Sequence, residues 1–428
     1  MEQGLITGIA VGIFLLTYAM IISERVHRTV AALFGAALVL FLRIVPWEKL
    51  PEHLDLDTIF LLIGMMIIVN TAKESGLFEF IAIKTAKFAR GSPMKVLILF
   101  SVVTALVSSV LDNVTTVLLF TPMLLYITRL MDVNPVPFLL AEIFASNIGG
   151  TATLIGDPPN IMIGSAAKLS FNEFLINMGP IAAVDLLVSL GIIYFAYRGV
   201  MKVSESKRER INTTIGELRE VDAIRDYVLF RKSLITILVV VGLFFIHDRL
   251  GIEPAVVALL GASALLLWSR AEPEEILERI EWTAIFFFVG LFILVGSLVE
   301  TGVIQRTAEW IMGYIGNTGE ALVIITWFSA LSSAIVDNIP LTAAMIPLIK
   351  AMGSTMNVYP LWWALSLGAC LGGNGTAIGA SANVVVIGIA AREGIRISFM
   401  DFLKVGVVIM MVTVAIGMGI LWVRYVGV

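Results

Sequence analysis

The sequence Asp112-Asn113-Val114-Thr115-Thr116, which runs on to Pro122, lies deep inside an apolar stretch. A related sequence, Asp337-Asn338-Ile339-Pro340, runs on to Pro347 and starts 225 residues later. A carboxylate in hydrocarbon costs several kcal/mol, so acidic residues in membrane segments usually mark a functional site. The paired Asp-Asn sequences therefore predict both a two-part fold and the place where the protein acts.

The composition around these sequences is that of a polytopic membrane protein. The 428 residues are 58% hydrophobic and 14% charged, with a mean hydropathy of +0.96. Apolar runs long enough to cross about 30 Å of hydrocarbon recur along the chain. The first run, Leu5–Ile22, lacks a basic leader and is followed by Ser23-Glu24-Arg25. We interpret it as a retained helix and not as a cleaved signal peptide.

Several classes of chemistry lack support in the sequence. The one cysteine, Cys370, can form neither a disulfide framework nor a multi-thiolate metal or arsenic site, so we assign it a structural role. The three histidines fall at predicted loop edges, and we expect no metal and no cofactor. The chain has no phosphate-binding loop, Walker lysine or Ser-His-Asp set. We expect neither an enzyme nor a nucleic-acid partner.

Residues far apart in the chain repeat at a nearly constant spacing. The offset is 226 residues early in each half, 225 at the Asp-Asn sequences and 223 later. The matching blocks are Val30–Ala36 with Val256–Ala262, Gly64 and Glu74 with Gly290 and Glu300, Asp112-Asn113 with Asp337-Asn338, and Gly149-Gly150 and Asn160 with Gly372-Gly373 and Asn383. This register indicates a duplicated unit.

Each unit is predicted to contain five crossings and one helical hairpin, and an odd number of crossings inverts the second unit. The predicted fold class is an all-α polytopic membrane protein with two inverted repeats of five transmembrane helices plus a re-entrant helical hairpin each. The first repeat covers 1–198, with the hairpin at 95–130 and an interrupted helix at 137–166. A cytoplasmic linker covers 199–230. The second repeat covers 231–428, with the hairpin at 320–352 and an interrupted helix at 360–392.

The distribution of Lys and Arg predicts the orientation. If the loop at 198–232 is cytoplasmic, 22 of the 29 Lys and Arg residues lie on that side. The positive-inside rule then places both termini outside the cytoplasmic (inner) membrane. This count does not distinguish re-entrant hairpin arms from full spans. Amphipathic segments at 73–90 and 300–315 are expected to lie in the membrane plane, either as mechanical arms or as simple connectors.

Four polar stretches converge if the repeats are inverted: two hairpin tips and two glycine-rich breaks in apolar helices. Gly and Pro permit unwound backbone, which is tolerated at membrane depth only in buried or water-lined places. Helix ends there add partial charges. The alternative role for the glycines is close helix packing. The predicted substrate-binding residues are Asn113, Thr115, Thr116, Asn147, Gly149, Gly150, Thr151, Asn160, Asn338, Thr342, Asn374, Gly375, Thr376 and Asn383.

Three aspartates are predicted to couple transport to protons or another ion. Asp112 and Asp337 sit at the hairpin tips, where they can also cap the following helix. Asp157 has Ala380 at its matching position, and this break in symmetry makes it a candidate proton carrier. Its alternative role is to end a helix before Pro158-Pro159.

These motifs resemble the ion transporter superfamily, within it the branch that holds the pigment-cell P protein and permeases labelled arsenite/antimonite efflux proteins. The motifs are Asp112 through Pro122, Asn147-Ile148-Gly149-Gly150 through Asn160, and Leu371 through Val384. The likeness covers nearly the whole chain. The resemblance implies an elevator-type secondary transporter, often dimeric, whose hairpin tips and broken helices surround one substrate. A homodimer and a cytoplasmic ATPase subunit are partners that the resemblance allows.

Relatives in this superfamily carry arsenite, silicic acid, citrate, dicarboxylates or sodium. The carboxylate branch typically has Ser-Asn-Thr at its hairpin tips, whereas this chain has Asp-Asn, which disfavours a sodium-coupled carboxylate carrier. The first hypothesis is efflux of arsenite or antimonite coupled to proton entry. The second is sodium/proton exchange on the same aspartates, and another small-anion carrier of the superfamily also stays open. A passive channel comes third, and a non-transporting scaffold or membrane enzyme last.

Overall fold

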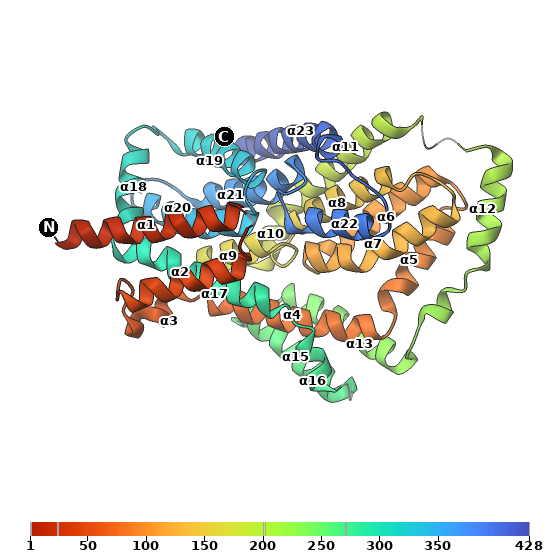
Figure 1. Cartoon of the computed structure of the whole chain (residues 1–428), viewed down its shortest axis with the longest axis horizontal. Helices are drawn as coiled ribbons and strands as arrows, with labels where there is room; N and C mark the ends of the chain where they lie inside the picture. Colours follow the sequence, from red (N-terminus) through yellow and green to blue (C-terminus); the bar gives the residue numbers. More distant parts are fainter. Residues whose placement is uncertain (1, 24, 200, 202, 270–271, 428) are drawn as a thin grey trace.

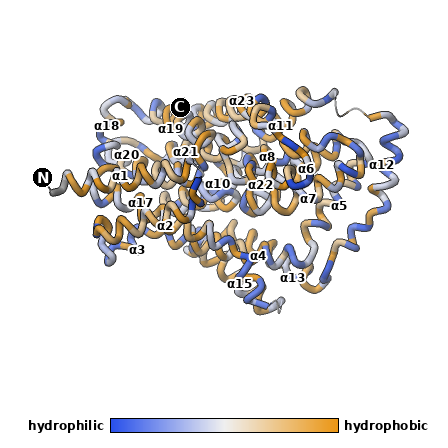
Figure 2. The backbone as a smooth tube through the Cα atoms, in the orientation of Figure 1, coloured by the Kyte–Doolittle hydropathy of each residue, from blue (hydrophilic) through white to orange (hydrophobic). Residues whose placement is uncertain are grey.

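The computed structural model describes residues 2–23, 25–199, 201, 203–269 and 272–427, and these form helices and turns without a strand. Within these ranges, seven helices are long and apolar enough to cross a membrane. Hydrophobic residues dominate these helices, whereas α12 (Glu205–Glu217) carries many hydrophilic ones (Figure 2). Lys202 and Arg270, which contributed to the predicted charge asymmetry, lie outside the described residues.

The helices of the first half follow the predicted order of crossings, hairpin and interrupted helix. They are α1 (Glu2–Ser23), α2 (Arg28–Phe41), η1 (Trp47–Lys49), α3 (Leu50–His53), α4 (Leu56–Glu74), α5 (Leu77–Phe88), α6 (Pro93–Ser108), α7 (Asn113–Leu130), α8 (Val136–Thr151), α9 (Pro158–Ala167), α10 (Phe171–Asn177) and α11 (Gly179–Tyr197).

The second half repeats this order after α12. Its elements are η2 (Glu220–Ala223), α13 (Tyr227–Phe244), α14 (His247–Leu250), α15 (Pro254–Ser269), α16 (Pro273–Glu278), α17 (Trp282–Glu300), α18 (Val303–Met312), α19 (Thr318–Ser333), α20 (Asn338–Met352), α21 (Tyr359–Gly372), η3 (Gly373–Gly375), α22 (Ser381–Arg392) and α23 (Phe399–Tyr425).

Two glycines separate a long helix from a short amphipathic one in each half. Gly76 and Gly302 adopt φ angles of 84° and 69°, which glycine tolerates best. The crossings α4 and α17 therefore end just before these glycines, and α5 and α18 start directly after them. The segments predicted at 73–90 and 300–315 thus each include the end of a long helix.

Four helices from both halves form one packed unit, the four-helix group: α2, α4, α15 and α17. Here α2 packs on α17 and α4 packs on α15, so each half contacts the other. Gly64 faces the backbone of Ala258, where a Cβ atom would lie only 2.7 Å from the carbonyl carbon. Its repeat counterpart Gly290 faces Ala32 in the same way, at 2.8 Å. The same close contact thus occurs twice.

The remaining inner helices form the hairpin group: the hairpins α6–α7 and α19–α20 with the interrupted helices α8–α9 and α21–α22. The first hairpin has its base beside α12, whereas the second has its base beside α18 and near the N-terminus, at the opposite end of the molecule (Figure 1). Two hairpins that enter from opposite ends are what inverted repeats require. The predicted fold class is confirmed, and the residue boundaries of the repeats stay predictions.

The linker between the halves is attached by ion pairs to α5 and to the loop that follows α7 of the hairpin group. Lys207 Nζ lies 3.0 Å from a carboxylate oxygen of Asp132, and Lys87 Nζ lies 2.6 Å from one of Glu220. The hydrogen bond from Lys87 lowers the pKa of Glu220, and that from Lys207 lowers the pKa of Asp132. Both pairs connect segments on the predicted cytoplasmic side.

Candidate functional site

Both hairpin tips end in an aspartate that caps the second arm. Asp112 accepts a hydrogen bond of 2.8 Å from the backbone N–H of Thr115, and Asp337 accepts one of 3.1 Å from that of Ile339. An aspartate at this position satisfies a helix N–H group that has no partner within the helix. The capping role is therefore present at both tips, and each carboxylate keeps a second oxygen for other partners.

The breaks in α8–α9 and α21–α22 are held by two asparagines. The amide of Asn160 donates to the carbonyls of Gly150 (3.1 Å) and Thr153 (2.9 Å). The amide of Asn383 donates to the carbonyls of Gly373 (2.7 Å) and Thr376 (2.9 Å). Unwound backbone leaves carbonyls without helical partners. These two predicted site residues supply those partners, and their amide N–H groups are directed at their own breaks.

The two interrupted helices are also joined by carboxamides in the centre of the hairpin group. Asn147 donates to the side-chain oxygens of Asn374 (2.9 Å) and Asn383 (3.0 Å), and Asn113 donates to Asn147 at 3.3 Å. Asn374 Nδ2 is buried and has no hydrogen-bond partner among the residues that the structure describes. A buried N–H group without a partner is costly. Asn374 therefore keeps a buried donor that is not used within the described protein.

A small cavity lies where the two halves meet. Its volume is about 40 Å³, and its lining includes four repeat-related pairs: Leu62 with Phe288, Asn113 with Asn338, Val114 with Ile339, and Pro158 with Ser381. Because both members of each pair line this space, it lies close to the pseudo-two-fold axis that relates the two halves. We take this space, the central cavity, as the candidate site.

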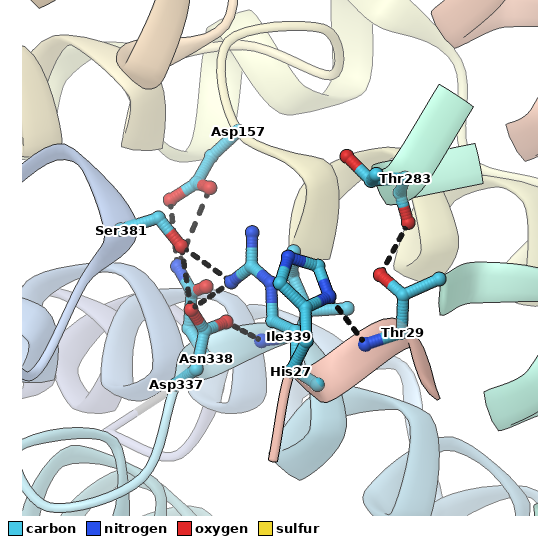
Figure 3. Close-up of polar contacts among 9 residues, drawn as sticks. His27, Thr29, Asp157, Thr283, Asp337, Asn338, Ile339 and Ser381 are labelled. Carbon is cyan, nitrogen blue, oxygen red and sulfur yellow. Dashed lines mark hydrogen bonds and ion pairs between the residues drawn. The ribbon is translucent and has the colours of Figure 1, made fainter. Parts of the chain in front are cut away.

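Carboxylates dominate the polar lining of the central cavity. Asp112, Asp157 and Glu281 line it, and both oxygens of Asp157 lie within 3.3 Å of the amide of Asn338 (Figure 3). Arg28 is the single cationic residue among the described residues that line the cavity. The predicted coupling residues Asp112 and Asp157 are thus brought together, in agreement with inverted repeats.

Three polar or charged residues that line this site were not among the predicted site residues: Arg28, Glu281 and Ser381. Arg28 starts α2 and Glu281 precedes α17, so both come from the four-helix group. Ser381 Oγ donates to Asp337 at 2.6 Å (Figure 3). One signal was available, since the repeat counterparts of Arg28 and Ser381 are both proline, at 254 and 158.

Other predicted residues lie near the site without lining the central cavity. The hydroxyls of four threonines donate to backbone carbonyls: Thr116 to Asp112, Thr151 to Asn147, Thr342 to Asn338, and Thr376 to Ala334. Gly149, Gly150 and Gly375 are in tight packing contact with neighbouring chain. Thr115 faces a neighbouring cavity.

Two further cavities flank the central one and are lined by repeat counterparts. The first, of about 250 Å³, is lined by Met66, Val69, Lys73, Thr115, Arg279 and Glu281, among others. The second, of about 580 Å³, includes Phe292, Val295, Val299 and Asp55, which correspond to Met66, Val69, Lys73 and Glu281. The first shares Met66 and Glu281 with the central cavity, whereas the second shares no lining residue with it.

The hairpin group is not centred between the two ends of the four-helix group. Arg28 meets Ser381, the first residue of α22. Its counterpart Pro254 instead shares a cavity of about 220 Å³ with Ile161 and Ser165, three to seven residues beyond the start of α9. At 1.5 Å per helical residue, this difference corresponds to about 5–10 Å along the helix. The hairpin group is therefore displaced toward the starts of α2 and α17.

Comparison with known proteins identifies the family to which this architecture belongs. A family model described as a citrate transporter matches residues 18–368. The chain belongs to the citrate transporter family. A protein named "46 kDa membrane protein" from Mycobacterium leprae is 43% identical over 97% of this chain and 98% of its own length. The chain is therefore a membrane transporter of this family.

The expected resemblance is also confirmed. The human P protein is 33% identical over 98% of this chain and 60% of its own length. Among solved structures, the YdaH transporter of Alcanivorax borkumensis matches with a TM-score of 0.62 at 13% identity, over 98% of both chains. At that identity the match supports the fold alone.

Proposed function

We propose that this chain is a proton-coupled secondary transporter that exports arsenite or antimonite by an elevator movement. The observation that carries the proposal is the central cavity, in which carboxamides of both halves face Asp112, Asp157 and Glu281. Arsenite and antimonite are mostly uncharged hydroxides near neutral pH. Amide and carboxylate oxygens accept hydrogen bonds from hydroxyl groups, and amide N–H groups donate to them.

The same lining disfavours a polyanion such as citrate, which the family description names. Among the described residues, three carboxylates and one arginine line the cavity, and this arginine is already paired with Asp337. Bringing several more negative charges into this space has no compensating partner. A small neutral solute together with a proton fits the charge balance better.

Proton coupling is assigned to Asp157, with Asp112 and Asp337 in support. Asp157 is 1% exposed, and its side chain is hydrogen bonded to two neutral groups, the amide of Asn338 and the thiol of Cys370. A buried carboxylate without a cation is stabilised by taking up a proton. A substrate that displaces Asn338 changes that balance, which is how proton and substrate can be exchanged.

The displaced position of the hairpin group supports the elevator part of the proposal. Its displacement is toward the starts of α2 and α17, the predicted cytoplasmic ends. The central cavity also shares Met66 and Glu281 with the flanking cavity that contains Lys73 and Arg279, on the same side. We therefore assign this conformation to the state that faces the cytoplasm, with both chain termini on the outer side of the inner membrane.

Sodium/proton exchange is the second candidate. Asp112, Asp157, Asp337 and Glu281 gather around one arginine, and carboxylate and amide oxygens are good ligands for a hard cation. The same residues then bind Na⁺ and H⁺ in alternation, without a metalloid.

The test is arsenite accumulation by everted membrane vesicles under an imposed proton gradient, with and without sodium. Accumulation that needs the proton gradient supports the proposal, provided that excess citrate does not compete. Sodium-driven pH change without arsenite uptake selects the second candidate. Arsenite uptake that is independent of every ion gradient indicates a passive channel and contradicts both candidate functions.

Vesicles with the Asp157→Asn variant provide the matched control. Asparagine keeps the shape and can still hydrogen bond, but it cannot exchange a proton at neutral pH. We expect proton-driven accumulation to be lost while the protein level and melting temperature are kept. Full proton-coupled rates in this variant contradict the role of Asp157.

A further inference from the structure

Arg28 connects the four-helix group to the tip of the second hairpin. Its Nη1 lies 3.0 Å from a carboxylate oxygen of Asp337 and 2.8 Å from Ser381 Oγ. Ser381 in turn donates to the same oxygen of Asp337 at 2.6 Å (Figure 3). The side chains of Arg28 and Asp337 are 35% and 16% exposed, so the pair is partly withdrawn from solvent. Such charge-assisted hydrogen bonds are stronger than neutral ones.

The backbone around Arg28 is held firmly. The hydroxyl of Thr29, the next residue, donates to the carbonyl of Thr283 at 2.7 Å (Figure 3), and the guanidinium lies over the ring of Phe287 at 5.3 Å. A second contact also joins this region to the second hairpin, since Tyr18 donates to the carbonyl of Pro340 at 2.8 Å. The arginine is therefore presented from a fixed position.

The pair cannot form at the other end of the movement. Under the repeat relation, Arg28 corresponds to Pro254, Ser381 to Pro158, and Asp337 to Asp112. In the mirror conformation, Asp112 and Pro158 approach Pro254 as Asp337 and Ser381 now approach Arg28. Both hydrogen-bond donors to the carboxylate are then replaced by proline side chains, which cannot donate.

We propose that Arg28 is a tethered cation that holds the transporter in the present conformation through Asp337 and Ser381, and that this Arg28 latch exists at one end of the transport cycle only. The inference rests on the elevator part of the proposed function. It makes the two conformations unequal in free energy, because only one of them contains the latch. An ion that neutralises Asp337 competes with Arg28 and releases the hairpin group.

The charges around the latch favour this competition. Three carboxylates line the cavity beside Arg28: Asp112 at the tip of the first hairpin, Asp157 just before α9 and Glu281 just before α17. When the arginine withdraws, four carboxylates lose their nearest cation. A cation or proton from solution must then enter the site to compensate these negative charges. The latch thereby connects ion binding to movement.

The test measures the mirror conformation directly and needs no substrate. Cysteines replace Pro158 and Pro254 in a Cys370→Ala background, and a bifunctional thiol reagent with a spacer about as long as an arginine side chain is applied to membranes. These two positions approach each other only in the mirror conformation. We expect Arg28→Gln to raise the cross-linking yield by about threefold to tenfold, as loss of one partly exposed charged hydrogen bond implies.

Three comparisons sharpen the result. Arg25→Gln removes an exposed arginine three residues earlier and should leave the yield unchanged. Arg28→Lys keeps the charge and should stay near the original yield. If Arg28→Gln fails to fold, Asp337→Asn breaks the same pair and should raise the yield instead, since asparagine also caps helices well.

An unchanged or lower yield in folded Arg28→Gln and Asp337→Asn proteins overturns the latch. This outcome is separate from failure of the proposed function, because arsenite transport is measured in vesicles whose protein carries neither cysteine. If cross-linking confirms the latch but the vesicles transport no arsenite, the proposed substrate is wrong and the latch proposal still holds.

Discussion

At the residue scale, most hydroxyl and amide groups of the polar stretches serve the backbone. The amides of Asn160 and Asn383 hold the two breaks, and Thr116, Thr151 and Thr342 donate to carbonyls of their own helices. Sequence alone cannot separate these uses from substrate binding, because both need the same donors and acceptors. Asn374 is the clearest exception, because its Nδ2 is buried and no described residue is its hydrogen-bond partner.

Asn374→Ala and Asn383→Ala should therefore behave differently. Loss of Asn374 removes an unused donor, while Asn147 keeps its bond to Asn383, so we expect transport to fall about tenfold with a stability loss below about 1 kcal/mol. Loss of Asn383 leaves two carbonyls without a partner and should cost about 1–3 kcal/mol. Thermal unfolding in detergent and vesicle transport measure the two effects, and equal stability losses contradict this division of roles.

At the element scale, the breaks are positioned by close contact between each interrupted helix and a hairpin arm. A Cβ atom on Gly149 would lie 2.2 Å from the carbonyl oxygen of Ala105, and one on Gly372 would lie 2.4 Å from that of Ala330. These repeat-related contacts are between backbones, which cannot rotate away. Packing and site geometry therefore depend on the same glycines, and the two roles that the sequence left open coincide there.

Gly149→Ala should separate α6 from α8 and cost at least about 1–3 kcal/mol, as expected for overpacking of a buried contact. Gly191→Ala in α11 is the matched control, because no described atom outside the adjoining helix backbone lies within 4 Å of the Cβ position there. Alanine also favours helix over glycine, so the control should be neutral or slightly stabilising. The melting temperatures of the two purified variants test this prediction. Similar values would show that α6 can move away from α8 at little cost in stability.

At the scale of the whole molecule, ion pairs bind the linker to α5 and to the loop after α7, and the pH dependence of these pairs can be predicted. The folded-state pKa values of Glu220 and Asp132 are lowered by Lys87 and Lys207. Their contribution is therefore complete above the ordinary carboxyl pKa of about 4 and is lost only as the pH falls through the lowered values. The pairs are partly exposed to solvent, so their individual contributions are small.

We expect linker docking to be independent of pH between about 5 and 8. Limited proteolysis of the segment around α12 at several pH values measures this, with the rate on a soluble peptide substrate as the control for the protease itself. The Lys87→Met variant should be cleaved faster throughout that range. A steep rise in linker cleavage between pH 7 and 5 would show that other groups control its attachment.

Much of the architecture could be predicted from the sequence, because hydropathy and repeat spacing are patterns that can be read along the chain. The hairpins expected at 95–130 and 320–352 run from Pro93 to Leu130 and from Thr318 to Met352. The interrupted helix expected at 137–166 is α8 with α9, from Val136 to Ala167. Apolar length, proline at helix starts and an aspartate before each second arm determine these limits.

The sequence by itself determined the helical class, the duplication and the location of the carboxylates, since each is a pattern along the chain. Only the tertiary structure decided which groups share the central cavity. Arg28 and Glu281 stand at helix starts, where a charge is ordinary, and Arg28 lies 309 positions before Asp337. Their approach depends on how far the hairpin group is displaced along the four-helix group. That displacement is a balance of contacts between distant elements, which no local pattern encodes.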